Sequence, residues 1–237
     1  MTDHENFDQV PYDEAETALQ VAGIVDILNQ DRTNRGRARI LDVGCGHGRI
    51  AAPLLDAIGA DRIELLGVDI DSGVGESFRS ATHGNADFAI GDLLEGTSLP
   101  GGPFDLILVL GNLFMTIREP SHLRDSYASI ARRLSPGGRL VIDDFAEGGW
   151  AEIAAGRWAD GVDETGQVQM IWIPGDPEFV VRMGSEVDPG STRPEPGERI
   201  LRLWSRRELD DAASKAGMTA GTHRSENLLS VHDRGIS

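Results

Sequence analysis

Residues 40–51 read ILDVGCGHGRIA, and this stretch decides the fold of the chain. Branched apolar residues around Asp42 predict a strand, three alternating glycines predict a turn after it, and the apolar run from Ile50 predicts a helix. Glycine lets the backbone come close to a ligand, and the first turn of a helix points free N–H groups at the preceding loop. The stretch therefore predicts a strand, a ligand-binding loop and a helix.

The spacing of the glycines separates two classes of cofactor. A dinucleotide-binding loop has the pattern G-x-G-x-x-G/A, whose third small residue lets helix and strand pack closely. Counted from Gly44, that third position is Arg49, which is too bulky for the role. The pattern D-x-G-x-G-x-G at residues 42–48 resembles instead the first motif of the class I S-adenosylmethionine (SAM) dependent methyltransferases. A glycine-rich turn without a ligand is the alternative. The resemblance implies that the methionine and ribose portions of SAM are surrounded by Asp42, Gly44, Cys45 and Gly46.

Two further predicted strands are followed by acids, as in the family. The strand at 63–71 reaches Asp69, which by resemblance accepts hydrogen bonds from both ribose hydroxyls. Ile70 is then expected to pack on the adenine. The strand at 86–90 precedes the residues that the resemblance places at the adenine amino group and ring nitrogen, Asp92 and Leu93.

The apolar run at 102–112 is typical of a strand buried on both faces of a parallel sheet. The resemblance places the amino group of SAM against the backbone at its end, near Leu110 and Gly111. The residues just beyond are expected to face the transferred methyl group: Asn112, Phe114, Met115 and Thr116. Ligands of parallel α/β sheets lie beyond the carboxyl ends of the strands, so polar residues at these ends predict a single site. These residues are Asp42, Asp69, Asp92, Asn112 and Asp144.

The remaining segments continue the alternation of strands and helices. Periodic apolar residues predict helices at 14–29, 121–134 and 205–216, a turn at 135–138, and strands at 139–145, 218–224 and 228–232. The pattern resembles an α/β, Rossmann-like class I methyltransferase fold with a mostly parallel seven-stranded sheet. The whole chain, 1–237, is expected to form one methyltransferase domain. Within it, 1–35 form an N-terminal lid helix and 146–204 an inserted antiparallel layer that covers the substrate.

Composition limits the class of protein. The chain of 237 residues is 40% hydrophobic, and its single cysteine, Cys45, allows no internal disulfide, which favours the cytoplasm. No apolar run reaches the ~20 residues of a membrane span, and the polar N-terminus predicts no signal peptide. The formal net charge of −17 disfavours nucleic acid partners. We expect a monomer or homodimer.

The resemblance implies a SAM-dependent methyltransferase, similar to enzymes that methylate amines of amino sugars and other secondary metabolites. Tyr12 is expected at the methionine end of SAM, and Tyr12 and Asp144 are expected to orient the acceptor or remove its proton. Trp150 and Trp172, in the insertion, are predicted to line the acceptor site. An O- or C-methyltransferase and a SAM-binding protein that transfers no methyl group are the alternatives. The histidines show no metal-ligand spacing, so no metal is expected.

Overall fold

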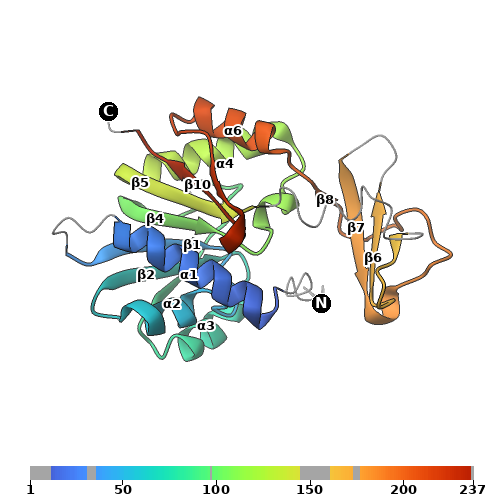
Figure 1. Ribbon diagram of the computed structural model, residues 1–237, viewed down its shortest axis with the longest axis horizontal. Helices are drawn as coiled ribbons and strands as arrows, with labels where there is room; N and C mark the ends of the chain where they lie inside the picture. Colours follow the sequence, from blue (N-terminus) through green and yellow to red (C-terminus); the bar gives the residue numbers. More distant parts are fainter. Residues whose placement is uncertain (1–11, 31–35, 97, 145–160, 173–176, 236–237) are drawn as a thin grey trace.

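The computed structural model describes residues 12–30, 36–96, 98–144, 161–172 and 177–235. Seven strands form one sheet in the order β3-β2-β1-β4-β5-β10-β9 (Figure 1). Strands β1 to β5 are parallel, and β10 is antiparallel to both of its neighbours. The predicted mostly parallel seven-stranded sheet is confirmed. The strands are β1 Ala38–Val43, β2 Ile63–Asp69, β3 Asp87–Ile90, β4 Phe104–Val109, β5 Leu134–Asp143, β9 Thr222–Arg224 and β10 Leu229–Asp233.

Helices cover both faces of this sheet (Figure 1). Helices α1, α2 and α3 pack on one face, and α4 and α6 pack on the other. Among the residues that the structure describes, no helix is long and apolar enough to cross a membrane. The helices are α1 Glu14–Gln30, α2 Ala51–Ile58, α3 Gly75–Ala81, α4 Pro120–Arg133 and α6 Arg206–Lys215, with 3-10 turns at η1 Ser72–Val74, η2 Leu113–Thr116, η4 Gly184–Glu186 and η5 Ser225–Asn227.

The central strands divide the core between the two faces. Successive side chains of a strand point to opposite faces, so Leu41 packs toward α4 and α6, whereas its neighbour Ile40 packs toward α1 and α2. Ile107 and Leu106 on β4 divide in the same way. All four side chains are fully buried, and each such burial contributes about 1.5–3 kcal/mol. The near-continuous apolar run that predicts β4 is therefore explained by helices on both faces.

The helix ends follow their local sequence. Ser205 and Glu208 form a capping box at the start of α6: Ser205 Oγ accepts from the Glu208 backbone N–H (3.3 Å), and Glu208 Oε2 accepts from the Ser205 N–H (2.9 Å). Pro120 occupies the first turn of α4, where its missing N–H costs no hydrogen bond. Pro120 and the capping box therefore explain where α4 and α6 begin.

The Ser-Pro-Gly-Gly run at 135–138 differs from its prediction as a turn. These residues lie within β5, whose pairing with β4 shifts register between the Phe104 and Leu106 positions. Gly137 has φ +76°, a left-handed conformation that glycine adopts without strain. These residues therefore form a β-bulge in place of a turn, and β5 begins directly after α4.

A second, antiparallel sheet stands beside the first (Figure 1). It has the order β6-β7-β8, with β6 Val168–Trp172, β7 Glu178–Met183 and β8 Leu201–Arg202, which confirms the predicted antiparallel layer. The Arg118 guanidinium, in the segment between η2 and α4, donates to both carboxylate oxygens of Glu178 on β7 (2.7 and 2.8 Å). The chain returns from this sheet through Trp204, whose Nε1 lies 3.0 Å from the carbonyl oxygens of Phe114 and Ile117. The second sheet is thus tied to the segment that follows β4.

Candidate active site

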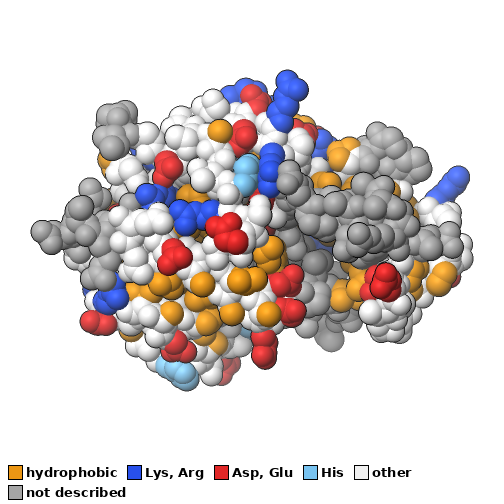
Figure 2. Space-filling model, viewed as in Figure 1, with side chains coloured by type: hydrophobic (Ala, Val, Ile, Leu, Met, Phe, Trp, Pro, Cys, Tyr) orange, Lys and Arg blue, Asp and Glu red, His pale blue; other side chains and the backbone are white. Residues whose placement is uncertain are grey.

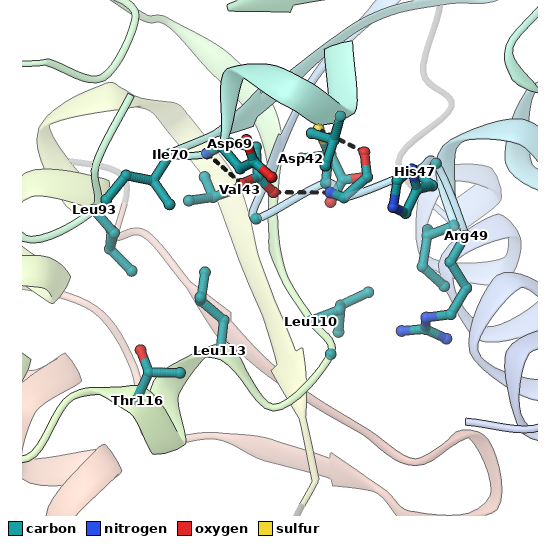
Figure 3. A pocket seen from close by; sticks show the side chains of 18 of the residues that line it. Asp42, Val43, His47, Arg49, Asp69, Ile70, Leu93, Leu110, Leu113 and Thr116 are labelled. Carbon is teal, nitrogen blue, oxygen red and sulfur yellow. Dashed lines mark hydrogen bonds between the residues drawn. The ribbon is translucent and has the colours of Figure 1, made fainter. Parts of the chain in front are cut away.

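A cavity of about 1210 Å³ opens at the carboxyl ends of β1, β2 and β4 (Figure 3). All of the residues predicted to contact the cofactor line this cavity. They come from five separate segments of the chain, which the sheet order brings to one edge. These residues are Tyr12, Asp42, Gly44, Cys45, Gly46, Asp69, Ile70, Asp92, Leu93, Leu110 and Gly111.

The glycine loop is held against β2 by its own N–H groups. The N–H groups of Gly44 and Cys45 donate to the Val68 carbonyl (2.7 and 3.1 Å), and the Gly46 N–H donates to Asp69 Oδ2 (2.9 Å). Gly46 has φ +49°, and a Cβ built on it would meet no atom within 4 Å. The loop therefore presents open space to the cavity while the Asp69 carboxylate fixes its position.

One side of the cavity combines an acid with apolar side chains. Asp69 accepts hydrogen bonds through both oxygens, since Oδ1 also accepts from the Asp71 N–H (2.9 Å). Ile70 is 69% exposed and Leu94 48% exposed, although both are large apolar side chains. Exposed apolar side chains at a cavity favour the binding of a flat apolar group such as a nucleobase.

Asp42 lies in the cavity wall but is only 3% exposed. Burial raises the pKa of Asp42 to about 7; the charge of Arg49 opposes this rise and that of Asp69 adds to it. Because the pKa of Asp42 is about 7, a charged ligand in the cavity would change the protonation of this carboxyl at neutral pH.

A polar cluster lies where α1 meets the ends of β4 and β5. The Tyr12 hydroxyl donates to Asp143 Oδ1 (2.5 Å) and lies 3.2 Å from Asn112 Oδ1. Gln20 Nε2 (3.0 Å) and the N–H groups of Gly111 (3.3 Å) and Asn112 (2.8 Å) also donate to the Asp143 carboxylate. Burial raises the pKa of Asp143, while these hydrogen bonds lower it. Burial, with the Asp143 charge, also raises the pKa of Tyr12, so its side chain is a neutral phenol at neutral pH.

Asp144, predicted to orient the acceptor, points away from this cluster. Its carboxylate accepts from Arg206 Nη2 (3.1 and 3.2 Å) and Ser225 Oγ (3.2 Å), and lies 3.3 Å from His223 Nδ1. It does not line the cavity. Neighbouring side chains at a strand end point in opposite directions, so Asp143, and not Asp144, contacts Tyr12.

The residues predicted to contact the acceptor are corrected in part. Phe114 is 1% exposed and stacks on Tyr127 in the core, with ring centres 5.3 Å apart, so it does not reach the cavity. Thr116 lines the cavity, whereas Met115 packs with the second sheet. Trp172 also packs there, 4.8 Å from Phe179 between ring centres, and is not a lining residue. Trp150 lies outside the described residues.

The cavity is also lined by residues that the sequence analysis did not predict, among them Arg49, Leu113 and Arg199. Leu113 lies in the predicted stretch after β4, where alternation could have suggested it. Arg49 directly follows the glycine loop, and this position could have suggested that it lines the cavity. Arg199 comes from the distant insertion and offers no local signal. In the described residues, no group of three or more histidine, cysteine or acidic side chains could hold a metal ion.

Residues 40–138 match the family model for a methyltransferase domain, which spans the glycine loop and strands β1 to β4. This part of the chain is therefore similar to methyltransferase domains. SAM is the cofactor that the resemblance of the glycine loop implies. SAM presents a ribose diol, a flat adenine and a sulfonium cation. The Asp69 carboxylate, the exposed Ile70 side chain and the acidic cavity wall fit these three groups.

Solved methyltransferases share the whole fold. The SAM-bound amino pentose methyltransferase CalS10 from Micromonospora echinaspora is 21% identical, with TM-score 0.62 over 98% of this chain and 99% of that one. The sugar N-methyltransferase KedS8 from Streptoalloteichus is 18% identical, with TM-score 0.66 over 96% and 90%. A SAM-dependent methyltransferase from Clostridium acetobutylicum is 13% identical, with TM-score 0.67 over 97% and 96%. At these identities the likeness establishes the fold.

Curated relatives match shorter segments. The ribosomal protein L11 methyltransferase of Ralstonia pickettii is 37% identical over 120 residues, which cover 49% of this chain and 35% of the relative. The ribosomal RNA small subunit methyltransferase C of Pseudomonas aeruginosa is 29% identical over 154 residues, or 55% and 43%. The chain thus spans less than half the length of these relatives, whose acceptors differ from each other.

Proposed function

We propose that this chain transfers the methyl group of SAM to an amine nitrogen of a small-molecule acceptor, such as an amino sugar or another secondary metabolite. The observation that carries the proposal is the cluster of Tyr12, Asn112 and Asp143. Tyr12 lines the cavity, and the other two residues fix its hydroxyl from behind. The hydroxyl oxygen keeps lone pairs with which to accept an N–H from an acceptor.

The chemistry requires orientation more than activation. SAM supplies a methyl group that its sulfonium already activates. The protein must hold a neutral amine in line with this methyl, and such positioning can contribute about 7–11 kcal/mol. A neutral Tyr12 phenol, with its hydrogen bond to Asp143, is suited to accept one amine hydrogen and fix the direction of the nitrogen lone pair.

The same pair offers a route for the proton that the amine loses. Methylation leaves a cationic nitrogen that carries an extra proton. Tyr12 can take this proton on its oxygen as it passes its own proton to Asp143 Oδ1, 2.5 Å away. Because burial raises the pKa of Asp143, that carboxylate is a better proton acceptor than an exposed one.

Size and charge support a small acceptor. A cavity of about 1210 Å³ is larger than the ~300–1,000 Å³ of most small-molecule sites, which leaves room for an acceptor beside SAM. The net charge of −17 opposes an RNA acceptor. On the face shown in Figure 2, basic side chains are scattered among acidic ones without forming a continuous basic surface. The inserted sheet would cover the acceptor, since Arg199 reaches the cavity from its side. The proposal includes action in the cytoplasm.

The test uses a matched pair of acceptors, an amino sugar and the same sugar with a hydroxyl in place of the amine. Mass spectrometry identifies the methylated atom, and release of S-adenosylhomocysteine gives the rate. We expect methylation of the amine, with kcat lowered about 10²-fold or more in Tyr12→Phe. Asp144→Asn should lower kcat less, because Asp144 lies outside the cavity.

Other outcomes select the alternatives. Methylation of the hydroxyl or of a carbon would replace the proposal with an O- or C-methyltransferase. Binding of SAM without turnover on a broad panel of acceptors would indicate a SAM-binding protein that transfers no methyl group.

A further inference from the structure

Gln20 is a fully buried amide in the middle of α1. The other buried residues of this helix carry no polar side chain: they are Val21, Gly23, Ile24 and Ile27. Burial of an amide among apolar groups is costly unless its polar atoms are hydrogen-bonded. The partners of Gln20 should therefore explain why an amide occupies this position.

Both ends of the Gln20 amide contact charged side chains. Its Oε1 accepts a hydrogen bond from Arg49 Nη1 (2.9 Å), and its Nε2 donates to Asp143 Oδ1 (3.0 Å). The reversed amide would set its NH₂ group against guanidinium donors and its oxygen against a carboxylate. Because a guanidinium only donates and an ionised carboxylate only accepts, one orientation alone makes both hydrogen bonds. Arg49 thus directs the Gln20 donor at Asp143.

Gln20 donates to the same oxygen atom as Tyr12. Asp143 Oδ1 accepts from the Tyr12 hydroxyl (2.5 Å), and it is the atom that takes the Tyr12 proton in the proposed reaction. Among the side chains that the structure describes, Gln20 and Tyr12 are the two donors to Asp143. Its other donors are the backbone N–H groups of Gly111 and Asn112. When the Tyr12 proton moves, Gln20 is the side-chain donor that stays in place.

The protonation of Asp143 depends on these neighbours, because the side chain is only 2% exposed. Burial raises the pKa of Asp143, whereas its hydrogen bonds, that of Gln20 among them, and the charge of Arg49 lower it. Among the described residues, the titratable or charged side chains that face it are Tyr12 and Arg49, and its register partner on β10 is a leucine. Only the ionised carboxylate can take a proton. Loss of the Gln20 donor would therefore reduce the share of molecules that can react.

We propose that Gln20 is a positioning residue for the methyl transfer: oriented by Arg49, it keeps Asp143 ionised and Oδ1 aligned to receive the Tyr12 proton. Gln20 does not line the cavity, so it acts through Asp143 and not on the acceptor. The inference rests on the proposed function, because the proton route is part of it. It also gives α1 a role in the reaction, since this helix supplies the amide.

NMR titration of the Asp143 carboxyl carbon tests the assignment without any turnover. Its ¹³C signal is identified by its loss in Asp143→Asn. Gln20→Met has a side chain of similar length without a donor, and it should raise the pKa of Asp143 by about one unit, as expected when a carboxylate loses one hydrogen bond. Gln20→Glu keeps the size and adds a second carboxylate, so it should raise this pKa further.

The pH profile of methyl transfer to an amino sugar is the second measurement. The ratio of kcat between variant and wild type cancels the titration of the amine, which both proteins share. In Gln20→Met this ratio should be about 0.1 at pH values below the pKa of Asp143 and should approach one at higher pH, where Asp143 is ionised in both proteins. KM for the acceptor should change little. A merely structural defect would instead lower kcat at every pH.

Thr17→Val is the matched control. Thr17 Oγ1 also accepts from Arg49 Nη1 (3.1 Å) and lies one turn before Gln20 on α1, but it is not among the donors to Asp143. This variant should keep the wild-type pKa of Asp143 and the wild-type pH profile. Gln20→Glu, which has the shape of glutamine, covers the case in which Gln20→Met fails to fold.

An unchanged pKa of Asp143 in the Gln20 variants would overturn the assignment, as would a raised pKa with a wild-type kcat profile. Equal effects in Thr17→Val would also overturn it, because they would act through Arg49 alone. If the wild-type protein methylates no amine, the proposed function is wrong. The NMR titration still decides in that case whether Gln20 controls the protonation of Asp143.

Discussion

Replacing Asp42 by asparagine should remove a pH dependence from the stability of the ligand-free protein. Burial raises the pKa of Asp42 from 3.8 to about 7. The folded protein then holds a proton on this carboxyl more tightly than the unfolded chain does, so this group favours folding below pH 4. The contribution is lost as the pH rises from about 4 to about 7, where the folded protein must carry a buried, ionised carboxylate.

The magnitude follows from the two pKa values. Integrated from pH 5 to pH 8, the difference corresponds to a loss of about 3 kcal/mol of unfolding free energy in the wild-type protein. Asparagine has no charge to bury, so Asp42→Asn should lose none of this. A buried asparagine adds a cost of its own, but that cost is the same at every pH. The informative quantity is therefore the difference between variant and wild type as a function of pH.

Urea denaturation followed by tryptophan fluorescence measures this difference, since Trp204 is buried in the core. Measurements should run from pH 5 to pH 8, above the pI of about 4.6. Asp56→Asn, which removes an exposed helix carboxylate, controls for the loss of one negative charge. If the difference between Asp42→Asn and wild type stays constant over this range, Asp42 is ionised throughout and the argument from its burial is wrong.

Two further variants test the core and a helix start. Phe114→Ala should lower the unfolding free energy by about 3–5 kcal/mol, because its ring stacks on Tyr127 in the core. Urea denaturation measures this loss. A loss below about 1 kcal/mol would contradict the burial of Phe114 and favour a position at the cavity, as the sequence predicts. Ser205→Ala should cost about 1 kcal/mol through loss of the capping box, seen as a lower thermal midpoint, whereas Ser205→Thr keeps the cap and should stay near wild type.

Much of the fold could be predicted because its signals are local. The strand, glycine loop and helix at 40–51 need only their own residues, and so does the capping box at Ser205. The place of the predicted cofactor residues at the cavity could be predicted as well, since parallel strands bring their carboxyl ends to one edge whatever the side chains do elsewhere. All of those residues line one cavity for this reason.

The acceptor side depends on single-residue register, which the sequence does not determine. Asp143 and Asp144 are adjacent acids at the end of β5, and strand alternation sends one to Tyr12 and the other to Arg206. Because both residues are aspartates, their identity does not indicate which of them contacts Tyr12. Only the side on which α1 packs decides between them, and that is a tertiary property. A shift of one residue would exchange their roles.

Phe114 differs from its prediction for a similar reason. The chain leaves β4 through Asn112, which has a left-handed backbone with φ +60°, and then forms the 3-10 turn η2. This turn directs Phe114 inward to Tyr127 and leaves Leu113 and Thr116 at the cavity. The left-handed residue sets these directions, and apolar periodicity carries no signal for it.

Arg49 occupies the position at which the dinucleotide-binding pattern has its third small residue. In that pattern the third small residue permits close contact between helix and strand. Here Gly48 has φ +90°, a conformation that favours glycine, and a Cβ on it would lie at an ordinary contact distance, 3.5 Å, from Phe78 and Ala81 of α3. The Arg49 side chain, one residue later, extends toward α1 and the cavity and donates a hydrogen bond to Gln20. The one-residue difference in glycine spacing that excludes a dinucleotide loop is therefore what brings a guanidinium to the cavity wall.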